Sequence, residues 1–405
     1  MVWRETYMKK VRGFIGETEV VKIMVGLRRS GKSVMLELIQ QELAEKGVRP
    51  ENMITLNFED MSLDELKEPK RLHGYLKSRI DAVEGRVYLF LDELQEVDNW
   101  EACINSLRVN SDVDIYITGS NSKMLAGEFA TRISGRYVQI QVYPFSFGEF
   151  CTALRERDSN LSDAELFKRY LRQGGMPFLV KAALSESDSK QYLQDLHASV
   201  VIKDIVKRNK IRGVDLLERI IAYVMANISK TFSANSLSNF FKSEKRAVAP
   251  ETILNYLKAC EDAYLFGRVS RLDVPGKKML QVNEKYYVAD HGLRQAVYGY
   301  NERDIELVLE NMVCLELWRR GYTVAVGRVG EKEIDFVGNK GENKRIYVQV
   351  CYLLASEETA NREFGVYYDI ADNYPKYVVS MDELDMSRDG IAHQNIRDFL
   401  LSDSF

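Results

Sequence analysis

Eight consecutive residues, GLRRSGKS, have the types and the spacing of a loop that binds phosphate groups. They follow the pattern G-x-x-x-x-G-K-[ST], with Gly26, Gly31, Lys32 and Ser33 at its fixed positions. The two glycines allow a tight turn in which successive backbone N–H groups point at phosphate oxygens. An apolar run, Val20–Val25, precedes the loop and a helical pattern follows it. A buried strand therefore leads into the loop, and the positive end of a helix meets the phosphates.

The chemistry of this loop predicts that its ligand is ATP with Mg²⁺. Lys32 is expected to reach the β- and γ-phosphates as a mobile positive charge. The Ser33 hydroxyl is placed to ligate Mg²⁺. A chance glycine-rich turn is the alternative, and the strand–loop–helix context argues against it. The residues expected to contact the nucleotide are Gly26, Arg28, Arg29, Ser30, Gly31, Lys32, Ser33 and Val34.

A second apolar strand, Arg86–Leu91, ends in two acids, Asp92 and Glu93. Magnesium-dependent hydrolysis of ATP needs such a pair. We expect Asp92 to hold Mg²⁺, directly or through water, and Glu93 to polarise the attacking water. The alternative is a buried strand with a polar end, which the upstream loop disfavours.

A further strand, Val113–Thr118, ends in Gly119, Ser120 and Asn121. Ligands of α/β proteins sit at the carboxyl ends of the strands. Asn121 and Ser120 are therefore candidates to bond the γ-phosphate or the attacking water.

Two arginines follow in the stretch ATRISGRY, Arg132 and Arg136. An arginine can neutralise charge in the transition state, from the same chain or from a neighbour. Arg136 is the better candidate, and a surface salt bridge is the competing interpretation.

Two other features near the loop leave alternatives open. Glu59 and Asp60 follow the strand Met53–Phe58, where they could face the nucleotide or cap the next element. Residues 3–16 predict a short helix that could flank the base or simply pack, with packing favoured.

The bulk properties are those of a soluble globular protein with two to four domains. The 405 residues include 56 Lys and Arg and 60 Asp and Glu, so the overall charge does not indicate nucleic-acid binding. The five cysteines form no C-x-x-C pair, which predicts a reducing compartment. With no apolar signal core and no long apolar run, we expect a cytoplasmic protein without a membrane partner.

Strands alternate with helices in the first part of the chain, which predicts an α/β fold with a parallel sheet and helices on both faces. The stretches GLRRSGKSVML, YLFLDELQEVDNWE, ITGSNSKML and SGRYVQIQVYPFSFGEF resemble bacterial and archaeal AAA-type P-loop ATPases. The chain is similar to signal-transduction (STAND) ATPases and to the archaeal ATPase group. The resemblance implies the usual ATPase roles for Lys32, Ser33, Asp92 and Glu93, and a sensor role for Asn121.

The middle of the chain combines a basic segment with a winged-helix pattern. The segment 200–212 contains Lys203, Lys207 and Arg208, which could lie on DNA phosphates or form a solvated helix end. Three helices, Leu216–Ile228, Ala234–Phe241 and Pro250–Cys260, precede a hairpin. In a winged helix bound to DNA, the third helix can enter the major groove and the hairpin can contact the DNA backbone. The hairpin is expected over Leu265–Val269 and Met279–Val282, with Arg268, Arg271, Lys277 and Lys278 near its tip. The outward residues of the third helix are Thr252, Asn255 and Lys258, and the remaining candidate DNA contacts are Thr252, Asn255 and Lys277. The alternative is a winged helix that only packs on the ATPase.

The last part of the chain resembles a restriction-endonuclease-type core. A helix carrying Glu310 is followed by a strand with Asp335 and a strand with Gln349 and Cys351. An active core needs Glu-x-Lys where Gln349 and Cys351 stand, because carboxylates bind Mg²⁺ and the lysine activates water. We therefore expect a nuclease-like fold that does not cut.

These features predict three domains, an AAA-type ATPase over 1–150, a helical and winged-helix domain over 151–282, and a nuclease-like domain over 283–405. The expected function is hydrolysis of Mg-ATP coupled to binding or remodelling of DNA. A signalling ATPase that acts on a protein partner and an ATP-gated nuclease are the alternatives. Oligomeric state stays open, because an arginine supplied by a neighbour implies a ring or a dimer.

Overall fold

The computed structural model describes residues 1–122, 133, 135–182, 184–276 and 278–402. The chain divides into two compact units. Unit 1 comprises Met1–Pro144 and Asp262–Tyr264, and unit 2 comprises Phe145–Glu261 and Leu265–Phe405. The predicted end of the first domain, residue 150, lies close to this division.

Unit 1 is built on a five-stranded sheet in the order β2-β3-β4-β1-β5. Every pair of neighbouring strands is parallel. Its strands are β1 (Val21–Val25), β2 (Met53–Asn57), β3 (Val87–Asp92), β4 (Val113–Gly119) and β5 (Tyr137–Gln141). Its helices are α1 (Glu5–Arg12), α2 (Lys32–Glu45), η1 (Pro50–Asn52), η2 (Met61–Lys67), α3 (Pro69–Ile80), η3 (Leu94–Glu96) and α4 (Trp100–Asn110).

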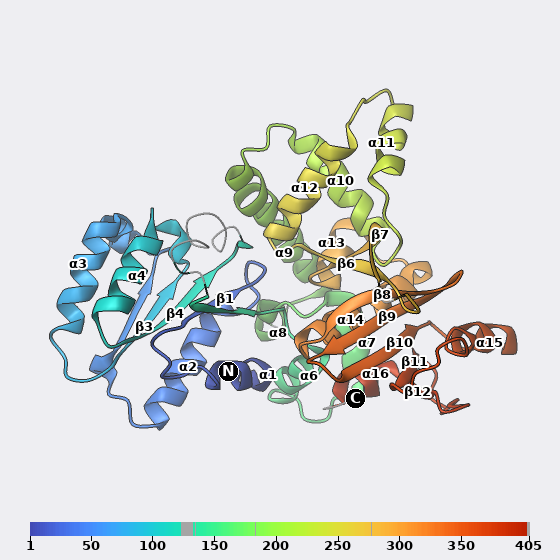
Figure 1. Cartoon of the computed structure of the whole chain (residues 1–405), viewed down its shortest axis with the longest axis horizontal. Helices are drawn as coiled ribbons and strands as arrows, with labels where there is room; N and C mark the ends of the chain where they lie inside the picture. The colour runs from blue at the N-terminus through green and yellow to red at the C-terminus, as the bar shows by residue number, and fades with distance from the viewer. Residues whose placement is uncertain (123–132, 134, 183, 277, 403–405) are drawn as a thin grey trace. The chain divides into compact units, whose positions relative to one another are not determined.

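Helices cover both faces of this sheet, as the alternation of strands and helices predicted (Figure 1). Side chains of α1 and α2, including Val11 and Ile39, pack with Met24, Phe90 and Tyr116 from three strands in one core cluster. Figure 1 shows α3 and α4 on the opposite side of the strands. Strand β4 lies between β1 and β3, so the carboxyl ends of these three strands are neighbours at one edge of the sheet.

Unit 2 contains a seven-stranded mixed sheet in the order β12-β11-β10-β9-β8-β6-β7. Its strands are β6 (Phe266–Asp273), β7 (Lys278–Val288), β8 (Thr323–Val329), β9 (Lys332–Lys340), β10 (Lys344–Val350), β11 (Lys376–Ser380) and β12 (Ala392–Asn395). Its helices are α6 (Phe147–Arg155), α7 (Asp163–Gln173), α8 (Pro177–Ala182), α9 (Glu186–Ser199), η5 (Val200–Lys207, a π-helix), α10 (Val214–Ala226), α11 (Ala234–Ser243), α12 (Pro250–Asp262), α13 (His291–Tyr298), η6 (Glu302–Asp304), α14 (Ile305–Arg319), α15 (Glu357–Gly365) and α16 (Ile396–Leu401).

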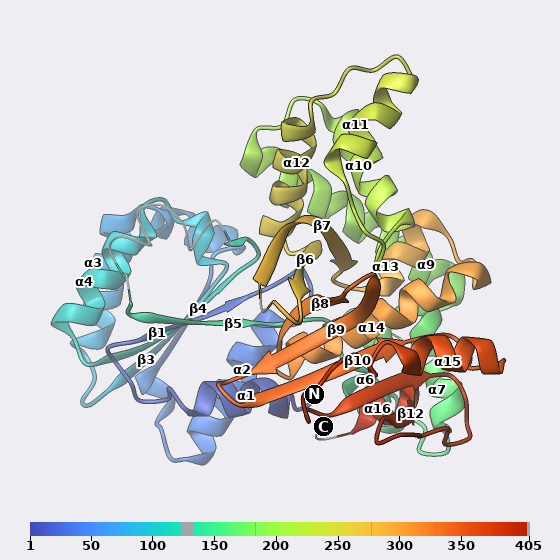
Figure 2. The same cartoon turned by 45° about the vertical axis from the view of Figure 1, so that its right-hand side comes forward.

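The helices α10 to α12 and the hairpin β6–β7 occur in the order that the sequence predicted (Figure 2). The hairpin is not a separate wing, because β6 also pairs with β8 in the large sheet. Strand β7 runs through the predicted boundary at 282/283. A domain boundary there would cut a strand that belongs to the sheet on both sides, so residues 145–405 are better described as one unit.

A glycine turn joins α7 to the rest of unit 2. Gly174 has a φ of +73°, and an added Cβ would meet the Asp290 carboxylate at 2.2 Å. Asp290 accepts a hydrogen bond from the Gly175 N–H at 2.7 Å and also caps α13. These contacts explain why the predicted turn requires glycine at Gly174.

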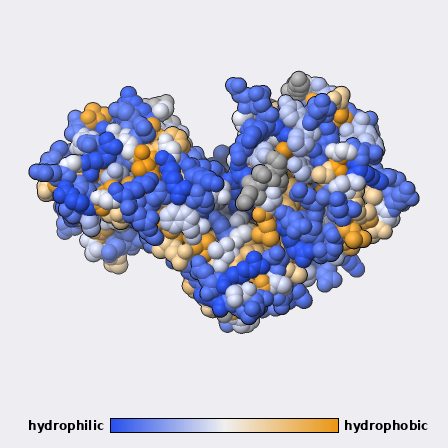
Figure 3. Space-filling view, turned by 90° about the horizontal axis from the view of Figure 1, so that it is seen from below, coloured by the Kyte–Doolittle hydropathy of each residue, from blue (hydrophilic) through white to orange (hydrophobic). Residues whose placement is uncertain are grey.

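The surface in Figure 3 is dominated by hydrophilic residues, with small apolar patches scattered among them. Among the described residues, no helix combines the length and the apolar character that a bilayer crossing requires.

Candidate nucleotide site

The glycines of the loop between β1 and α2 adopt conformations that other residues avoid. Gly26 has a φ of +146°, and a Cβ on it would meet the Val142 carbonyl oxygen at 2.2 Å. Gly31 has a φ of +102° and is the N-cap residue of α2. The sequence pattern therefore corresponds to a real backbone requirement at both positions.

The Lys32 ammonium group lies folded over this loop. Its Nζ donates to the carbonyl oxygens of Gly26 at 3.2 Å and Leu27 at 3.1 Å. The same atom is 3.9 Å from Glu93 Oε1. The loop thus places a positive charge beside an acid of β3, at the edge where the carboxyl ends of β1, β4 and β3 meet.

The loop also contains a polar atom that is ready for a ligand. The Ser30 hydroxyl oxygen is buried and has no hydrogen-bond partner among the described residues. A buried polar atom without a partner costs free energy unless a ligand or water satisfies it. This unsatisfied hydroxyl fits a phosphate group, and Ser33 is exposed at the start of α2.

Arg4 supports the loop through hydrogen bonds, and the sequence did not predict this role. Its guanidinium group donates to the Ser30 carbonyl oxygen at 3.1 Å and to the Tyr143 carbonyl oxygen at 2.8 Å. Its side chain is only 1% exposed and lies over the Tyr7 ring. Helix α1 is thus a packing helix, shorter than the predicted 3–16, and a lone arginine in a lead-in helix gives no signal of this contact.

Thr118 organises the two acids that follow β3, a second contact that the sequence did not indicate. Its hydroxyl donates to Asp92 Oδ1 and accepts from the Glu93 N–H at 2.9 Å. Glu93 itself adopts a φ of +53°, in the left-handed region. Asp92 is 5% exposed, and Thr118 fixes its carboxylate together with the backbone of Glu93.

The electrostatic surroundings of Glu93 suit a general base. Burial raises the pKa of the Glu93 carboxyl, and the nearby Lys32 ammonium and a hydrogen bond from Gln95 oppose that shift. A carboxylate with a raised pKa accepts a proton more readily near neutral pH.

The two acids after β2 have separate roles. Glu59 pairs with Arg28 of the loop at 3.1 Å. Asp60 caps the helix η2 by accepting the Ser62 N–H at 2.9 Å. The capping alternative is therefore realised at Asp60, and Glu59 pairs with a residue of the loop.

The residues after β4 lie where a sensor is expected. Ser120 and Asn121 are fully buried beside the carboxyl ends of β1 and β3. The next residue, Ser122, donates to Asp262 at 2.9 Å within unit 1.

Arg136 occupies the opposite edge of the sheet, which corrects the prediction that it could act within its own chain. It immediately precedes β5, and its carbonyl oxygen accepts the Val21 N–H at the start of β1. Five strand residues at about 3.3 Å each place it roughly 16 Å from the loop. Arg136 is exposed and free to meet a neighbouring chain, whereas Arg132 lies outside the described residues.

The candidate DNA contacts of unit 2 are only partly available. Lys203, Lys207 and Asn255 are exposed, whereas Thr252 is half-buried. Arg208 lies 3.7 Å from Asp204. Lys277 lies outside the described residues.

The hairpin arginines are ion-paired, although Arg268 stays exposed, and their positions correct the prediction that they lie near its tip. Arg268 is 3.0 Å from Glu284, and Arg271 is 2.8 Å from Glu333. Neither residue is at the tip, because β6 and β7 are longer than the sequence predicted.

The three residues of the predicted nuclease-like core, in contrast, lie close together. Gln349 accepts the Asp335 N–H at 3.2 Å, and Glu310 and Asp335 both approach Lys285, at 3.0 Å and 3.7 Å. Lys285 comes from β7, outside the expected motif, so motif spacing could not reveal it.

Comparison with known proteins supports the assignment of the first unit. Residues 18–151 match the family description "AAA domain", and residues 164–304 match a domain of unknown function (DUF8612). An uncharacterized protein of Haemophilus influenzae is 35% identical over 405 residues, which is 99% of each chain. This chain belongs to the same family. An uncharacterized protein of Methanocaldococcus jannaschii is 30% identical to this member over 365 residues, 86% of this chain and 78% of that protein.

Solved structures show more distant likeness. An Aeropyrum pernix Orc1 protein in complex with DNA is 12% identical, with a TM-score of 0.31, covering 73% of this family member and 92% of that chain. The replication initiator DnaA bound to AMPPCP and single-stranded DNA is 14% identical, with a TM-score of 0.34, covering 64% and 86%. At these scores the assignment rests on the AAA domain and on the geometry of unit 1.

Proposed function

We propose that this protein binds ATP with Mg²⁺ at the loop between β1 and α2 and hydrolyses it. The nucleotide state then changes the conformation of the rest of the chain. Lys32 would hold the β- and γ-phosphates, while Ser33 and Asp92 would hold the metal. Bound Mg²⁺ neutralises charge that develops on the phosphate oxygens. Glu93 would orient the attacking water and take its proton at the carboxylate, and Asn121 would bond the γ-phosphate.

The observation that carries this proposal is the grouping of Lys32, Asp92 and Glu93 at one sheet edge. Thr118 holds both acids by hydrogen bonds, and Lys32 lies 3.9 Å from Glu93. A positive charge for phosphate, an acid for metal and a base for water thus occupy one edge.

Equilibrium titration with Mg-ATP tests the binding step. Lys32→Ala should weaken affinity by roughly 100-fold, because a charge-assisted contact to phosphate is lost. Lys46→Ala is a matched control, since Lys46 lies just after the same helix and bonds Glu42 instead. Unchanged affinity in Lys32→Ala would overturn the site.

For the partner, we favour DNA, bound by the region of unit 2 around α12 and η5. Supporting observations are the exposed Lys203 and Lys207, one turn apart, and the exposed Asn255 and Lys258 on α12. The paired hairpin arginines reduce the contribution expected from the hairpin. The AAA-type neighbours crystallised with DNA are distant and add no argument.

Charge reversal separates this proposal from its alternative. Lys203→Glu/Lys207→Glu should weaken DNA binding and lower its salt dependence by about one unit per lost phosphate contact. Lys70→Glu/Lys77→Glu on α3 reverses the same charge elsewhere. Equal binding by both double variants would shift the proposal to a protein partner, captured in one nucleotide state only.

Two hydrogen bonds within unit 1 support a route for the proposed switch. Asp262, the last residue of α12, belongs to unit 1 and accepts a hydrogen bond from Ser122, next to Asn121. Tyr264 lies in the same segment and accepts from Gln139 at 3.3 Å. We propose that nucleotide state reaches α12 and β6 through this segment. The five buried free cysteines favour a cytoplasmic location.

We also infer a restriction-endonuclease-like core that does not cut in the C-terminal part. The order of α14, β9 and β10 supports it, as does the position of Gln349 and Cys351 on β10 and directly after it. Burial keeps the Cys351 thiol neutral by raising its pKa, so this thiol cannot replace a catalytic lysine.

A further inference from the structure

A cluster of buried charges lies inside unit 2, where β7, α14 and β9 meet. Lys285 Nζ is 3.0 Å from Glu310 Oε1, 2.9 Å from Glu333 Oε1 and 3.7 Å from Asp335 Oδ1. Tyr287 donates its hydroxyl to the same Glu310 oxygen at 2.7 Å. One ammonium group therefore serves three carboxylates, which come from two different elements.

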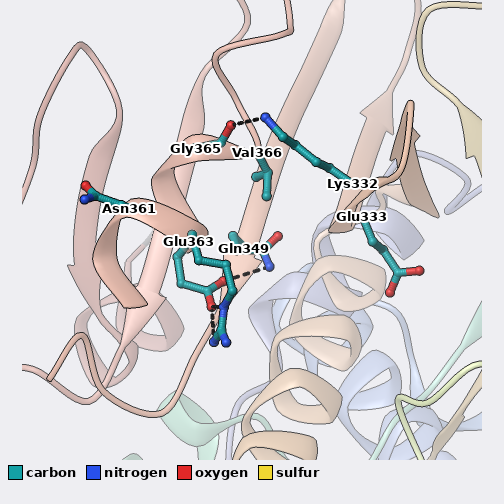
Figure 4. Close-up of a pocket in the computed structure, with 8 residues that line it drawn as sticks. Lys332, Glu333, Gln349, Asn361, Glu363, Gly365 and Val366 are labelled. Atoms are coloured by element: carbon teal, nitrogen blue, oxygen red, sulfur yellow. Dashed lines mark hydrogen bonds and ion pairs between the residues drawn. The ribbon is translucent and has the colours of Figure 1, made fainter. Parts of the chain in front are cut away.

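Polar atoms of Asp335 and Gln349 beside this cluster are also engaged. Asp335 Oδ2 accepts the Val350 N–H at 2.8 Å. Gln349 accepts the Asp335 N–H through Oε1 and donates through Nε2 to Glu363 at 2.9 Å, as Figure 4 shows for the second bond. The donors expected of a metal site are thus bonded to protein groups.

Poor access of cations to the cluster does not account for these internal bonds. A cavity of about 340 Å³ lies beside the cluster, lined in part by Glu333, Gln349 and Glu363. The Glu333 side chain is 32% exposed. A hydrated cation could approach, and yet among the described residues no carboxylate, histidine and cysteine side chains are grouped as a metal site.

We propose that the ammonium group of Lys285 permanently occupies the place that a divalent cation takes in a nuclease-like core. The cluster then binds no Mg²⁺ and cuts no nucleic acid. Its role is to join β7, α14 and β9, and so to tie the hairpin to the rest of the large sheet.

The charge balance agrees with this role. Burial lowers the pKa of Lys285, but Glu310, Asp335 and Glu333 outweigh burial and raise it, so Lys285 stays charged. Burial raises the pKa of Asp335. The raised pKa favours protonation of this carboxylate, which reduces the excess negative charge of the cluster.

Thermal unfolding of nucleotide-free protein, with and without Mn²⁺, tests the proposal. The melting temperature of wild type should not respond to Mn²⁺. Lys285→Ala should melt on the order of 10 °C lower, because carboxylates lose their buried partner. Mn²⁺ should restore part of this loss by binding the vacated position.

Two variants serve as controls. Lys285→Ala/Asp335→Asn should lose the response to Mn²⁺. Lys332→Ala removes an exposed lysine from the edge of the same cavity and should change neither quantity. A folded Lys285→Ala protein that ignores Mn²⁺ would overturn the proposal.

A measurement on wild type needs no variant to fold. Electron paramagnetic resonance of added Mn²⁺ should show only free ion with nucleotide-free wild type. Incubation of that protein with DNA and Mg²⁺ or Mn²⁺ should yield no cleavage product. Bound Mn²⁺, or cleavage, that disappears in Asp335→Asn would overturn the proposal.

Discussion

The molecule contains two places where a lysine faces buried carboxylates, and the two differ in how the lysine is held. In unit 1, Lys32 rests on two backbone carbonyl oxygens and lies 3.9 Å from Glu93. In unit 2, Lys285 makes contacts of 2.9 and 3.0 Å with two carboxylates and lies near a third. Residue types alone would not separate them.

The difference lies in what each lysine leaves unsatisfied. Around Lys32, the Ser30 hydroxyl has no partner among the described residues. Around Lys285, polar atoms of Asp335 and Gln349 are bonded to other protein groups. A site open to a ligand retains unmet hydrogen-bonding capacity, whereas a structural ion cluster satisfies its own.

The same substitution at the two lysines should therefore have opposite consequences, and this is the largest effect we expect. Lys285→Met should reduce the free energy of unfolding by roughly 3–5 kcal/mol, because it leaves buried carboxylates unpaired. Mg-ATP affinity should stay near that of wild type. Lys32→Met should instead weaken nucleotide binding by roughly 100-fold and change stability by only about 1 kcal/mol. Calorimetry and nucleotide titration on both variants check this. If the two variants lost stability and Mg-ATP affinity to the same extent, the comparison would fail.

Removing the hydroxyl that orients the two acids should slow catalysis. Thr118→Val keeps the shape of the side chain but loses the bonds to Asp92 and to the Glu93 N–H. We expect kcat for ATP hydrolysis to fall by roughly 10- to 100-fold, with nucleotide affinity changed less. Thr118→Ser should recover most of the rate, and failure to do so would indicate a packing role.

The support that Arg4 gives the loop should appear in affinity. Arg4→Met removes hydrogen bonds to the Ser30 and Tyr143 carbonyl oxygens. We expect Mg-ATP affinity to fall by about tenfold, with stability lower by roughly 1–3 kcal/mol. Arg12→Met, which loses ion pairs with Glu5 and with Glu42 of α2, controls for general damage to that helix. If both variants bind alike, Arg4 does not position the loop.

The rate should also depend on pH through Glu93. Its carboxylate acts as a base only when deprotonated, and burial raises its pKa above that of an ordinary glutamate. Activity should therefore be full above this raised pKa and decline as pH falls through it. A pH–rate profile of kcat should show this acidic limb in wild type, and an identical limb in Glu93→Gln would assign it to another group.

The smallest effect concerns Arg136. Because it lies at the far edge of the sheet, Arg136→Ala should leave the rate of an isolated chain within about twofold of wild type. A rate that rises with protein concentration only when Arg136 is present would show that a neighbouring chain supplies it.

The sequence predicted the elements whose signal is local. The strand–loop–helix around Lys32, the acids after β3 and the order of α10 to α12 all follow from short patterns. Long-range pairs gave no such signal. Arg4 meets residues far along the chain, and Lys285 reaches carboxylates of α14 and β9 that only the fold brings near. The pairing of β6 with β8 was missed for the same reason, since nothing local marks which strand edges will join.

The central claim is that Glu93 at this sheet edge activates water for hydrolysis of ATP. The most direct test is single-turnover hydrolysis of Mg-ATP by wild type and by Glu93→Gln, with Glu59→Gln as a nearby control. We predict that Glu93→Gln binds ATP with wild-type affinity but hydrolyses it at least roughly 100-fold more slowly, while Glu59→Gln stays near wild type. Hydrolysis by Glu93→Gln at the wild-type rate would contradict the account.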